Sequence, residues 1–165
     1  MAFRRDQIGP GFVYAVRSTN PANCNEFKVG LTNDPELRRL TLSGTASPLP
    51  YAFERVWAVS NMALAEDIAH RMLEDHSMNV DREHFYIVPV HMLEGVFGSL
   101  WYEPSEDELD ICLSALLDRV ESKFMLHRET LNWYEVDCAK LPAYSRGRLA
   151  WRRGSLGGLP PEPLF

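Results

Sequence analysis

The 165 residues fit one compact domain with a short appendage, and their composition, 45% apolar and 24% charged, excludes wholesale disorder. The net charge of −6 weakens non-specific attraction to phosphate backbones without excluding a local basic surface. No apolar run is long enough to span a membrane, and Met1–Gln7 lacks the apolar stretch of a secretory signal, so we expect a cytoplasmic protein with no membrane partner.

The first half of the chain predicts two strands, a helix and a third strand. Residues 11–16 are β-branched and aromatic, and a second short strand at 26–31 follows a turn-forming loop, so the two should pair as an antiparallel hairpin. Asn33 or Asp34 offers an N-cap for a helix over 35–42, and Pro35 suits its first position. The third strand is expected over 51–59.

The second half alternates helix and strand and ends in a long helix. We expect a helix over 61–75, a strand over 84–90 and a short helix over 91–100. Ser105 and Glu108 form a capping box, and the apolar residues behind them repeat with helical spacing, which predicts an amphipathic helix over 105–128. That helix is expected to pack on the core, with a lid or a homodimer face as alternatives.

The order of these elements predicts the fold class. A β-β-α-β-α-β order favours an α+β fold with a small, mainly antiparallel sheet flanked by helices, followed by the C-terminal amphipathic helix and a tail. We expect a domain over 10–93, a helical extension over 94–139 and a basic, Pro/Gly-rich tail over 140–165.

The three cysteines, Cys24, Cys112 and Cys138, are too few and too scattered for a disulfide framework or a zinc site. We therefore expect three free thiols, with Cys112 buried in the long helix.

The C-terminal tail carries five basic residues and one acidic residue, whereas residues 101–139 carry three basic and ten acidic ones. The basic tail could bind a phosphate backbone while one of its aromatic rings stacks on a base. It could equally dock on the acidic segment before it. The candidate nucleic-acid-binding residues in the tail are Arg146, Arg148, Trp151, Arg152 and Arg153.

Five polar residues carry groups that suit phosphodiester hydrolysis. A carboxylate can hold a hard Mg²⁺ that keeps most of its waters, and a guanidinium can neutralise charge on phosphate oxygens. A phenol, an imidazole or a metal hydroxide can deprotonate or orient the attacking water. The five residues are Tyr14, Lys28, Arg38, His70 and Glu83.

The spacing of these residues resembles a known family. The segment Gly11-Phe-Val-Tyr14, then Lys28-Val-Gly30, then Arg38 eight residues beyond Gly30 resembles the GIY-YIG nuclease superfamily. The similarity is greatest to the phage and bacterial branch in which KIG or KVG replaces YIG. It continues through Ala65-Glu66 with His70 and closes with Arg82-Glu83-His84-Phe85-Tyr86, covering residues 10–93.

The resemblance implies a role for each residue and a phage-associated setting. Tyr14 would lie near the attacking water, Arg38 would contact the scissile phosphate, and Glu83 would bind a single Mg²⁺ or Mn²⁺. His70 would assist proton transfer or hold the phosphate, although a structural histidine paired with Glu66 is the alternative. Arg39, next to Arg38, points about 100° away on the helix and is a surface charge or a further contact to nucleic acid.

The sequence departs from the wider superfamily at Lys28, where the second motif usually has a tyrosine. A lysine accepts a proton at neutral pH only if its surroundings lower its pKa well below about 10.4. A charged Lys28 would instead bind phosphate. The identity of the general base therefore stays open among Tyr14, His70 and metal-bound water.

Two functions follow from this sequence. The first is a metal-dependent endonuclease of GIY-YIG type acting on DNA, with RNA as a possible substrate. The second is a nucleic-acid- or protein-binding module that has lost hydrolysis, which Lys28 and the acidic net charge keep open. An enzyme for small phosphorylated molecules has no supporting P-loop or GxGxxG motif.

Overall fold

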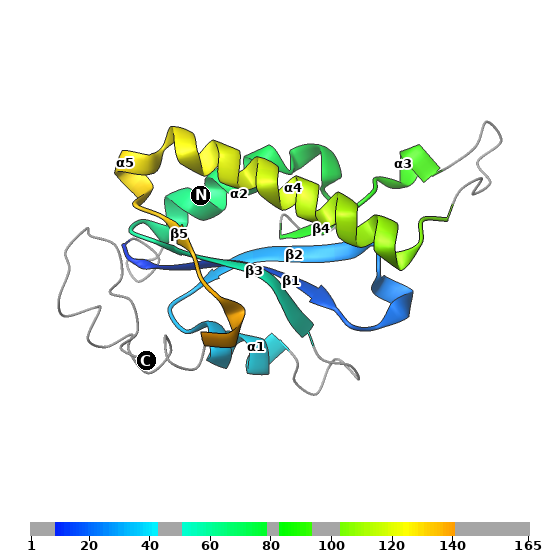
Figure 1. Ribbon diagram of the computed structural model, residues 1–165, viewed down its shortest axis with the longest axis horizontal. Coiled ribbons are helices and arrows are strands. Elements are labelled where there is room, and N and C mark those ends of the chain that lie inside the picture. Colours follow the sequence, from blue (N-terminus) through cyan, green and yellow to red (C-terminus); the bar gives the residue numbers. More distant parts are fainter. Residues whose placement is uncertain (1–8, 43–50, 79–82, 94–102, 141–165) are drawn as a thin grey trace.

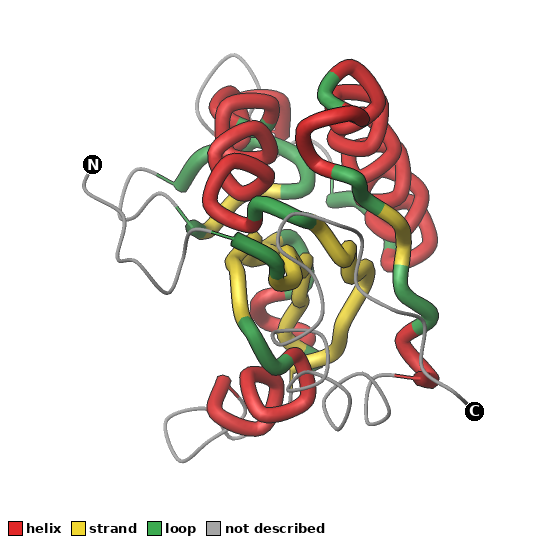
Figure 2. Tube along the Cα trace, turned by 90° about the vertical axis from the view of Figure 1, so that its left-hand side faces the viewer, coloured by secondary structure: helices red, strands yellow, loops and turns green. Residues whose placement is uncertain are grey.

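The computed structural model describes residues 9–42, 51–78, 83–93 and 103–140, and within them the chain forms three layers. A twisted sheet lies in the middle, with two long helices over one face and a short helix under the other (Figure 1). Figure 2 shows the same layers end on, with the helix pair above the yellow strands and the short helix below them. No helix in the described ranges is both long and apolar enough to cross a membrane.

The sheet confirms the expected α+β fold. Its strands are β1 (Gly11–Ser18), β2 (Glu26–Thr32), β3 (Tyr51–Val59), β4 (His84–Tyr86) and β5 (Tyr134–Glu135). They lie in the order β4-β2-β1-β3-β5, and all four neighbouring pairs are antiparallel. The predicted hairpin is β1 with β2, in a register that sets Tyr14 opposite Gly30.

The helices begin where the sequence supplies caps. They are α1 (Pro35–Leu42), α2 (Met62–Met72), α3 (Val90–Leu93), α4 (Glu106–Leu126) and α5 (Arg128–Leu131), with short 3-10 turns at Pro21–Asn23, Glu74–His76 and Cys138–Lys140. The Asp34 side chain accepts a hydrogen bond from the Leu37 amide, and Asn61 caps α2 in the same way. Ser105 and Glu108 form the predicted capping box of α4.

The alternation of side chains along the strands divides the core in two. Val13, Ala15, Val29 and Trp57 face α2 and α4 and join the apolar stripes of both helices. Tyr14, Phe12 and Val16 face the other way, over α1. Because α4 contributes buried side chains to the larger cluster, it is part of the same core as the sheet, as its apolar spacing predicted.

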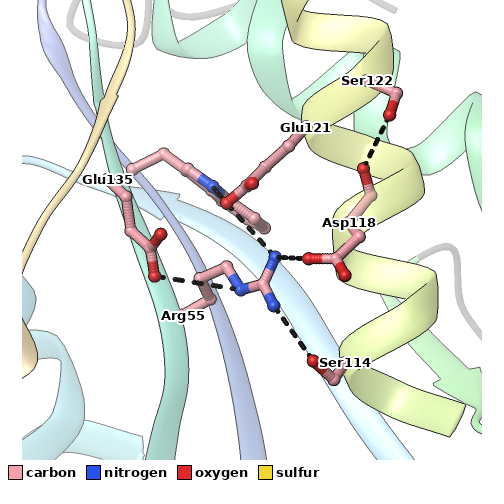
Figure 3. Close-up of polar contacts among 7 residues, drawn as sticks. Arg55, Ser114, Asp118, Glu121, Ser122 and Glu135 are labelled. Atoms are coloured by element: carbon pink, nitrogen blue, oxygen red, sulfur yellow. Dashed lines mark hydrogen bonds and ion pairs between the residues drawn. The ribbon is translucent and has the colours of Figure 1, made fainter. Parts of the chain in front are cut away.

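A cluster of polar contacts fixes α4 to the sheet (Figure 3). The Arg55 guanidinium on β3 contacts the carboxylates of Asp118 at 2.8 Å and Glu121 at 3.2 Å, both on α4. It also lies 4.0 Å from Glu135 on β5. The indole N–H of Trp57 donates to the same Glu121 at 2.9 Å. Arg55 therefore joins two strands and a helix through one side chain.

Three sequence expectations change in the structure. The strand predicted over 84–90 ends at Tyr86, because the Val88 amide and carbonyl bond the Asn25 side chain and Pro89 has no N–H. Strand β5 was not expected. All three cysteines are free, as predicted, but Cys112 is half-buried rather than buried. The helix predicted over 91–100 is described only as far as Leu93, and the rest lies outside the described residues.

Candidate functional site

Tyr14 and Arg38 are joined on the α1 face of the sheet. The Nε–H of Arg38 donates to the Tyr14 hydroxyl at 3.0 Å. The Tyr14 ring packs edge-on to Phe53 and is fully buried, whereas Arg38 is half-buried. Of this pair, the guanidinium is therefore the part that faces solvent, and the phenol holds it in place.

Gly30 is needed beneath this pair. It lies opposite Tyr14 across the β1–β2 ladder, and a Cβ added there would come within 2.5 Å of the phenol oxygen. Any larger residue would push the hydroxyl away from Arg38. The glycine of the Lys28-Val-Gly30 motif is thus explained by close approach of the tyrosine ring.

Lys28 and Glu83 form an ion pair at the edge of the sheet. The Lys28 ammonium contacts the Glu83 carboxylate, and the lysine side chain is only 8% exposed while the glutamate side chain is 48% exposed. In the ladder, Tyr14 faces Gly30 and Val16 faces Lys28, so Tyr14 and Lys28 are diagonal neighbours on one face, with Cα atoms about 7–8 Å apart. The two bonded pairs therefore start from neighbouring positions of the hairpin.

His70 contacts the edge of β2 just beyond the first residue of β4, His84. The last pair of that ladder is Lys28 with His84, after which the Val29 amide donates to the Glu83 carbonyl at 3.0 Å. The Val29 carbonyl is 3.0 Å from His70 Nε2, and since a carbonyl only accepts, Nε2 carries the proton. The imidazole replaces a missing strand amide and fixes the backbone beside Glu83.

The protonation of His70 follows from its burial. Desolvation lowers the pKa of His70, against the backbone hydrogen bond to Val29 and the charge of Glu83, which raise it. A neutral imidazole with its proton on Nε2 leaves Nδ1 as the atom that can accept a proton. The contact with Val29 gives His70 a positioning role at the β2 edge that was not expected from the sequence, and its approach to Glu66 at 3.8 Å is the pairing expected as the alternative to a catalytic role.

Glu66 is a member of this site that sequence reasoning did not assign. Its side chain is 16% exposed, and its carboxylate lies 3.8 Å from His70 Nε2, one helical turn along α2. Burial first, and then the charge of Glu83, raise the pKa of Glu66 to about 7, against the lowering effect of Lys28. The spacing of Glu66 and His70 was visible in the sequence, but the burial was not.

The remaining predicted residues cannot be placed in the site. The tail residues Arg146, Arg148, Trp151, Arg152 and Arg153 lie outside the described residues, and so does the side chain of Arg39. The structure thus brings together Tyr14 with Arg38, and Lys28 with Glu83, with His70 on the far side of the β2 edge.

The donor chemistry at Glu83 fits the divalent cation that the family resemblance implied. A half-exposed carboxylate can bind Mg²⁺ while water fills the other coordination positions, which is the arrangement Mg²⁺ prefers. Across the described ranges, no three His, Cys, Asp or Glu side chains gather to hold a metal, so those ranges contain no all-protein cage. The Lys28 ammonium contacts the same carboxylate.

Comparison with known proteins gives one match. A family model described as the T5orf172 domain matches residues 11–114, from the start of β1 into α4. The domain occurs in phage and bacterial proteins and is nuclease-like or DNA-binding in character. No curated protein and no solved structure matches the chain.

Proposed function

The chain belongs to the T5orf172 domain family, and from this premise we propose that it is a metal-dependent endonuclease of GIY-YIG type that hydrolyses phosphodiester bonds in DNA. One observation carries the proposal. Tyr14, which holds Arg38, and Lys28, which pairs with Glu83, are diagonal neighbours in the β1–β2 ladder, although the four residues are far apart in the chain.

Each residue has a task that follows from its contacts. Arg38, oriented by the Tyr14 hydroxyl, neutralises negative charge that develops on the phosphate oxygens. Lys28 binds phosphate as a cation, and His70 holds the backbone that carries Glu83. Mg²⁺ or Mn²⁺ held by Glu83 would supply Lewis-acid stabilisation of the same charge.

Charge favours the α1 face as the side that meets nucleic acid. The exposed surface of α4 carries carboxylates, including Glu106 and Asp107 in its first turn, which repel a phosphate backbone. The opposite face holds Arg38 and Lys28. DNA is therefore expected to approach from the side of α1, and RNA is the alternative substrate.

A second function is favoured by two specific observations. The Glu83 carboxylate is already paired with an ammonium, that of Lys28, and the Tyr14 ring is fully buried and so is not presented to a substrate directly. A fold with these contacts could bind nucleic acid or protein without hydrolysis. The cleavage assay separates this binding module from the endonuclease.

The test is cleavage of plasmid DNA by the full-length protein with Mg²⁺ or Mn²⁺. We expect metal-dependent cutting that falls at least about 10²–10³-fold in Glu83→Gln. The matched control is Glu129→Gln, an exposed carboxylate on α5 that should leave cutting unchanged.

The other outcomes decide between the proposals. Binding of DNA and RNA without cutting under any metal condition would establish the binding module. Cutting of RNA alone would move the substrate class to RNA. Equal losses in Glu83→Gln and Glu129→Gln would remove Glu83 from the site.

A further inference from the structure

The Lys28–Glu83 ion pair occupies the carboxylate that the proposed function needs for a metal. Lys28 is almost wholly buried and contacts Glu83, whereas Glu83 itself is about half exposed. An ammonium and a divalent cation held on one carboxylate repel each other strongly at such short separations. The two cations therefore compete for Glu83.

We propose that the Lys28 ammonium occupies the cation position at Glu83 in the free protein, and that it moves to a phosphate of the substrate when a divalent cation binds. The inference rests on the proposed function and deepens it, because it makes Lys28 the residue that couples metal binding to nucleic-acid binding.

The strand register places Lys28 near the position that a substrate phosphate would occupy at Arg38. Lys28 is the diagonal neighbour of Tyr14 on the same face, and Tyr14 holds Arg38 at 3.0 Å. A phosphate contacted by Arg38 would thus lie within reach of an ammonium on a four-carbon stem. The ammonium would exchange the Glu83 carboxylate for this phosphate.

Glu66 is a second acidic group beside this edge. Its side chain on α2 is 16% exposed, and the charges of Lys28 and Glu83 both act on its carboxyl group. Because burial and the charge of Glu83 raise the pKa of Glu66 to about 7, Glu66 holds its proton for part of the time near neutral pH. Glu83 is therefore the carboxylate for which the ammonium and the divalent cation compete.

Coupling of this kind is reciprocal. If DNA draws Lys28 from Glu83, DNA strengthens metal binding, and the metal strengthens DNA binding by the same factor. Couplings between two ligands commonly lie between about 5-fold and 150-fold. Because of Lys28, the protein would then bind the divalent cation more tightly when DNA is bound than when it is free.

The experiment measures the Mn²⁺ dissociation constant of the full chain by electron paramagnetic resonance of the free ion. We expect Lys28→Met to bind Mn²⁺ about tenfold more tightly than the wild type. Lys28→Arg keeps the charge and should stay within about twofold of the wild type. Thermal unfolding of each variant checks that the fold is retained.

A second arm adds a short DNA duplex with phosphorothioate linkages, which resist cleavage. DNA should tighten Mn²⁺ binding to the wild type about tenfold, and should do so much less for Lys28→Met. Mn²⁺ bound by the duplex alone is measured separately and subtracted.

The results overturn the inference in three ways. Mn²⁺ affinity that is unchanged or weaker in Lys28→Met removes the competition. A gain that persists in the Lys28→Met, Glu83→Gln double variant places the metal elsewhere. An equal effect of DNA on the wild type and Lys28→Met removes the coupling.

Failure of the inference is distinct from failure of the proposed function. A protein that never cuts DNA but binds Mn²⁺ more tightly as Lys28→Met supports the exchange and contradicts the endonuclease. A protein that cuts DNA but whose Mn²⁺ affinity ignores Lys28 supports the endonuclease and overturns the exchange.

Discussion

The two faces of the sheet use the same central strands but treat charge differently. On the face covered by α2 and α4, Arg55 is held by carboxylates on α4, and Arg17 contacts Asp110 of the same helix at 2.5 Å. On the α1 face, Arg38 is held by a neutral phenol, so its positive charge is not neutralised by that contact.

This difference separates the side that holds the fold together from the side that can bind an anion. A guanidinium paired with carboxylates has its charge satisfied within the protein. A guanidinium oriented by a hydroxyl keeps its charge for a ligand. The first arrangement serves stability, and the second serves recognition of phosphate, so substitutions on the two faces should have different consequences.

The largest effect is expected from the covered face. Phe124 of α4 is fully buried and packs edge-on against Trp57 at a ring distance of 5.4 Å. Phe124→Ala should lower the free energy of unfolding by about 3–5 kcal/mol, through the lost transfer energy and the cavity left behind. Urea denaturation measures this. A loss of less than about 1 kcal/mol would contradict the packing described for this face.

Arg38→Ala should reduce cleavage and leave stability nearly unchanged. Cleavage should fall about 10²–10³-fold, because a charge that stabilises the phosphate is lost, while the unfolding midpoint changes little. Gel assays of cleavage and thermal unfolding together check both parts. Arg71→Ala is the matched control, since Arg71 is exposed on α2 and pairs with Asp67 of the same helix. Equal losses in the two variants would break the contrast between the faces.

Arg55→Met tests the other half of the comparison. It leaves Asp118 and Glu121 without their shared cation, so we expect a loss of about 2 kcal/mol in unfolding free energy and unchanged cleavage by the folded protein. Arg128→Met, an exposed position on α5, controls for removal of one positive charge. A drop in cleavage with no change in stability would place Arg55 on the functional side.

The smallest effect is a pH dependence at the edge of β2. Burial raises the pKa of Glu66 to about 7, so the folded chain binds that proton more tightly than the unfolded chain does. The contribution of Glu66 to the free energy of unfolding is therefore fully present below the ordinary glutamate pKa, and it is lost as the pH rises through about 7. Glu66→Gln should become more stable relative to the wild type as pH is raised across this range, as thermal unfolding at several pH values would show.

His70 works in the opposite direction and must be measured alongside. Burial lowers the pKa of His70, so its contribution to stability rises with pH up to the ordinary histidine value of 6.5. His70→Gln should remove that rise. A difference between Glu66→Gln and the wild type that stays constant with pH would mean that Glu66 is not buried as described.

The fold was predictable where signals are local. The capping box of Ser105 and Glu108, the cap at Asp34 and the β-branched and aromatic stretch of β1 each depend on neighbouring residues, and each was predicted. Strand β5 was not, because its two residues are strands only through pairing with Trp57 and Ala58. The early end of β4 likewise depends on hydrogen bonds between the Val88 backbone and the Asn25 side chain, which are more than sixty residues apart in the sequence.

The site was predictable as a set of residue types but not as a set of contacts. Motif spacing selected Tyr14, Arg38 and Glu83 as candidates, and in the fold Arg38 of α1 donates to the Tyr14 hydroxyl of β1. The Lys28–Glu83 pair depends on the pairing of β2 with β4, which no local sequence pattern predicts. The unusual protonation of Glu66 comes from burial, and burial is a property of the folded chain alone.

The outermost strands also govern how copies of the chain can meet. β4 has three residues and β5 has two, and beyond β4 the open carbonyl of β2 is taken by the His70 ring. At β4 and β5 a neighbouring chain therefore finds little unpaired backbone on which to add a strand, so growth of the sheet at these two strands is discouraged. Two copies could pair through helical surface instead, and the exposed Ile111, Met125 and Leu126 of α4 are the first residues to examine by crosslinking.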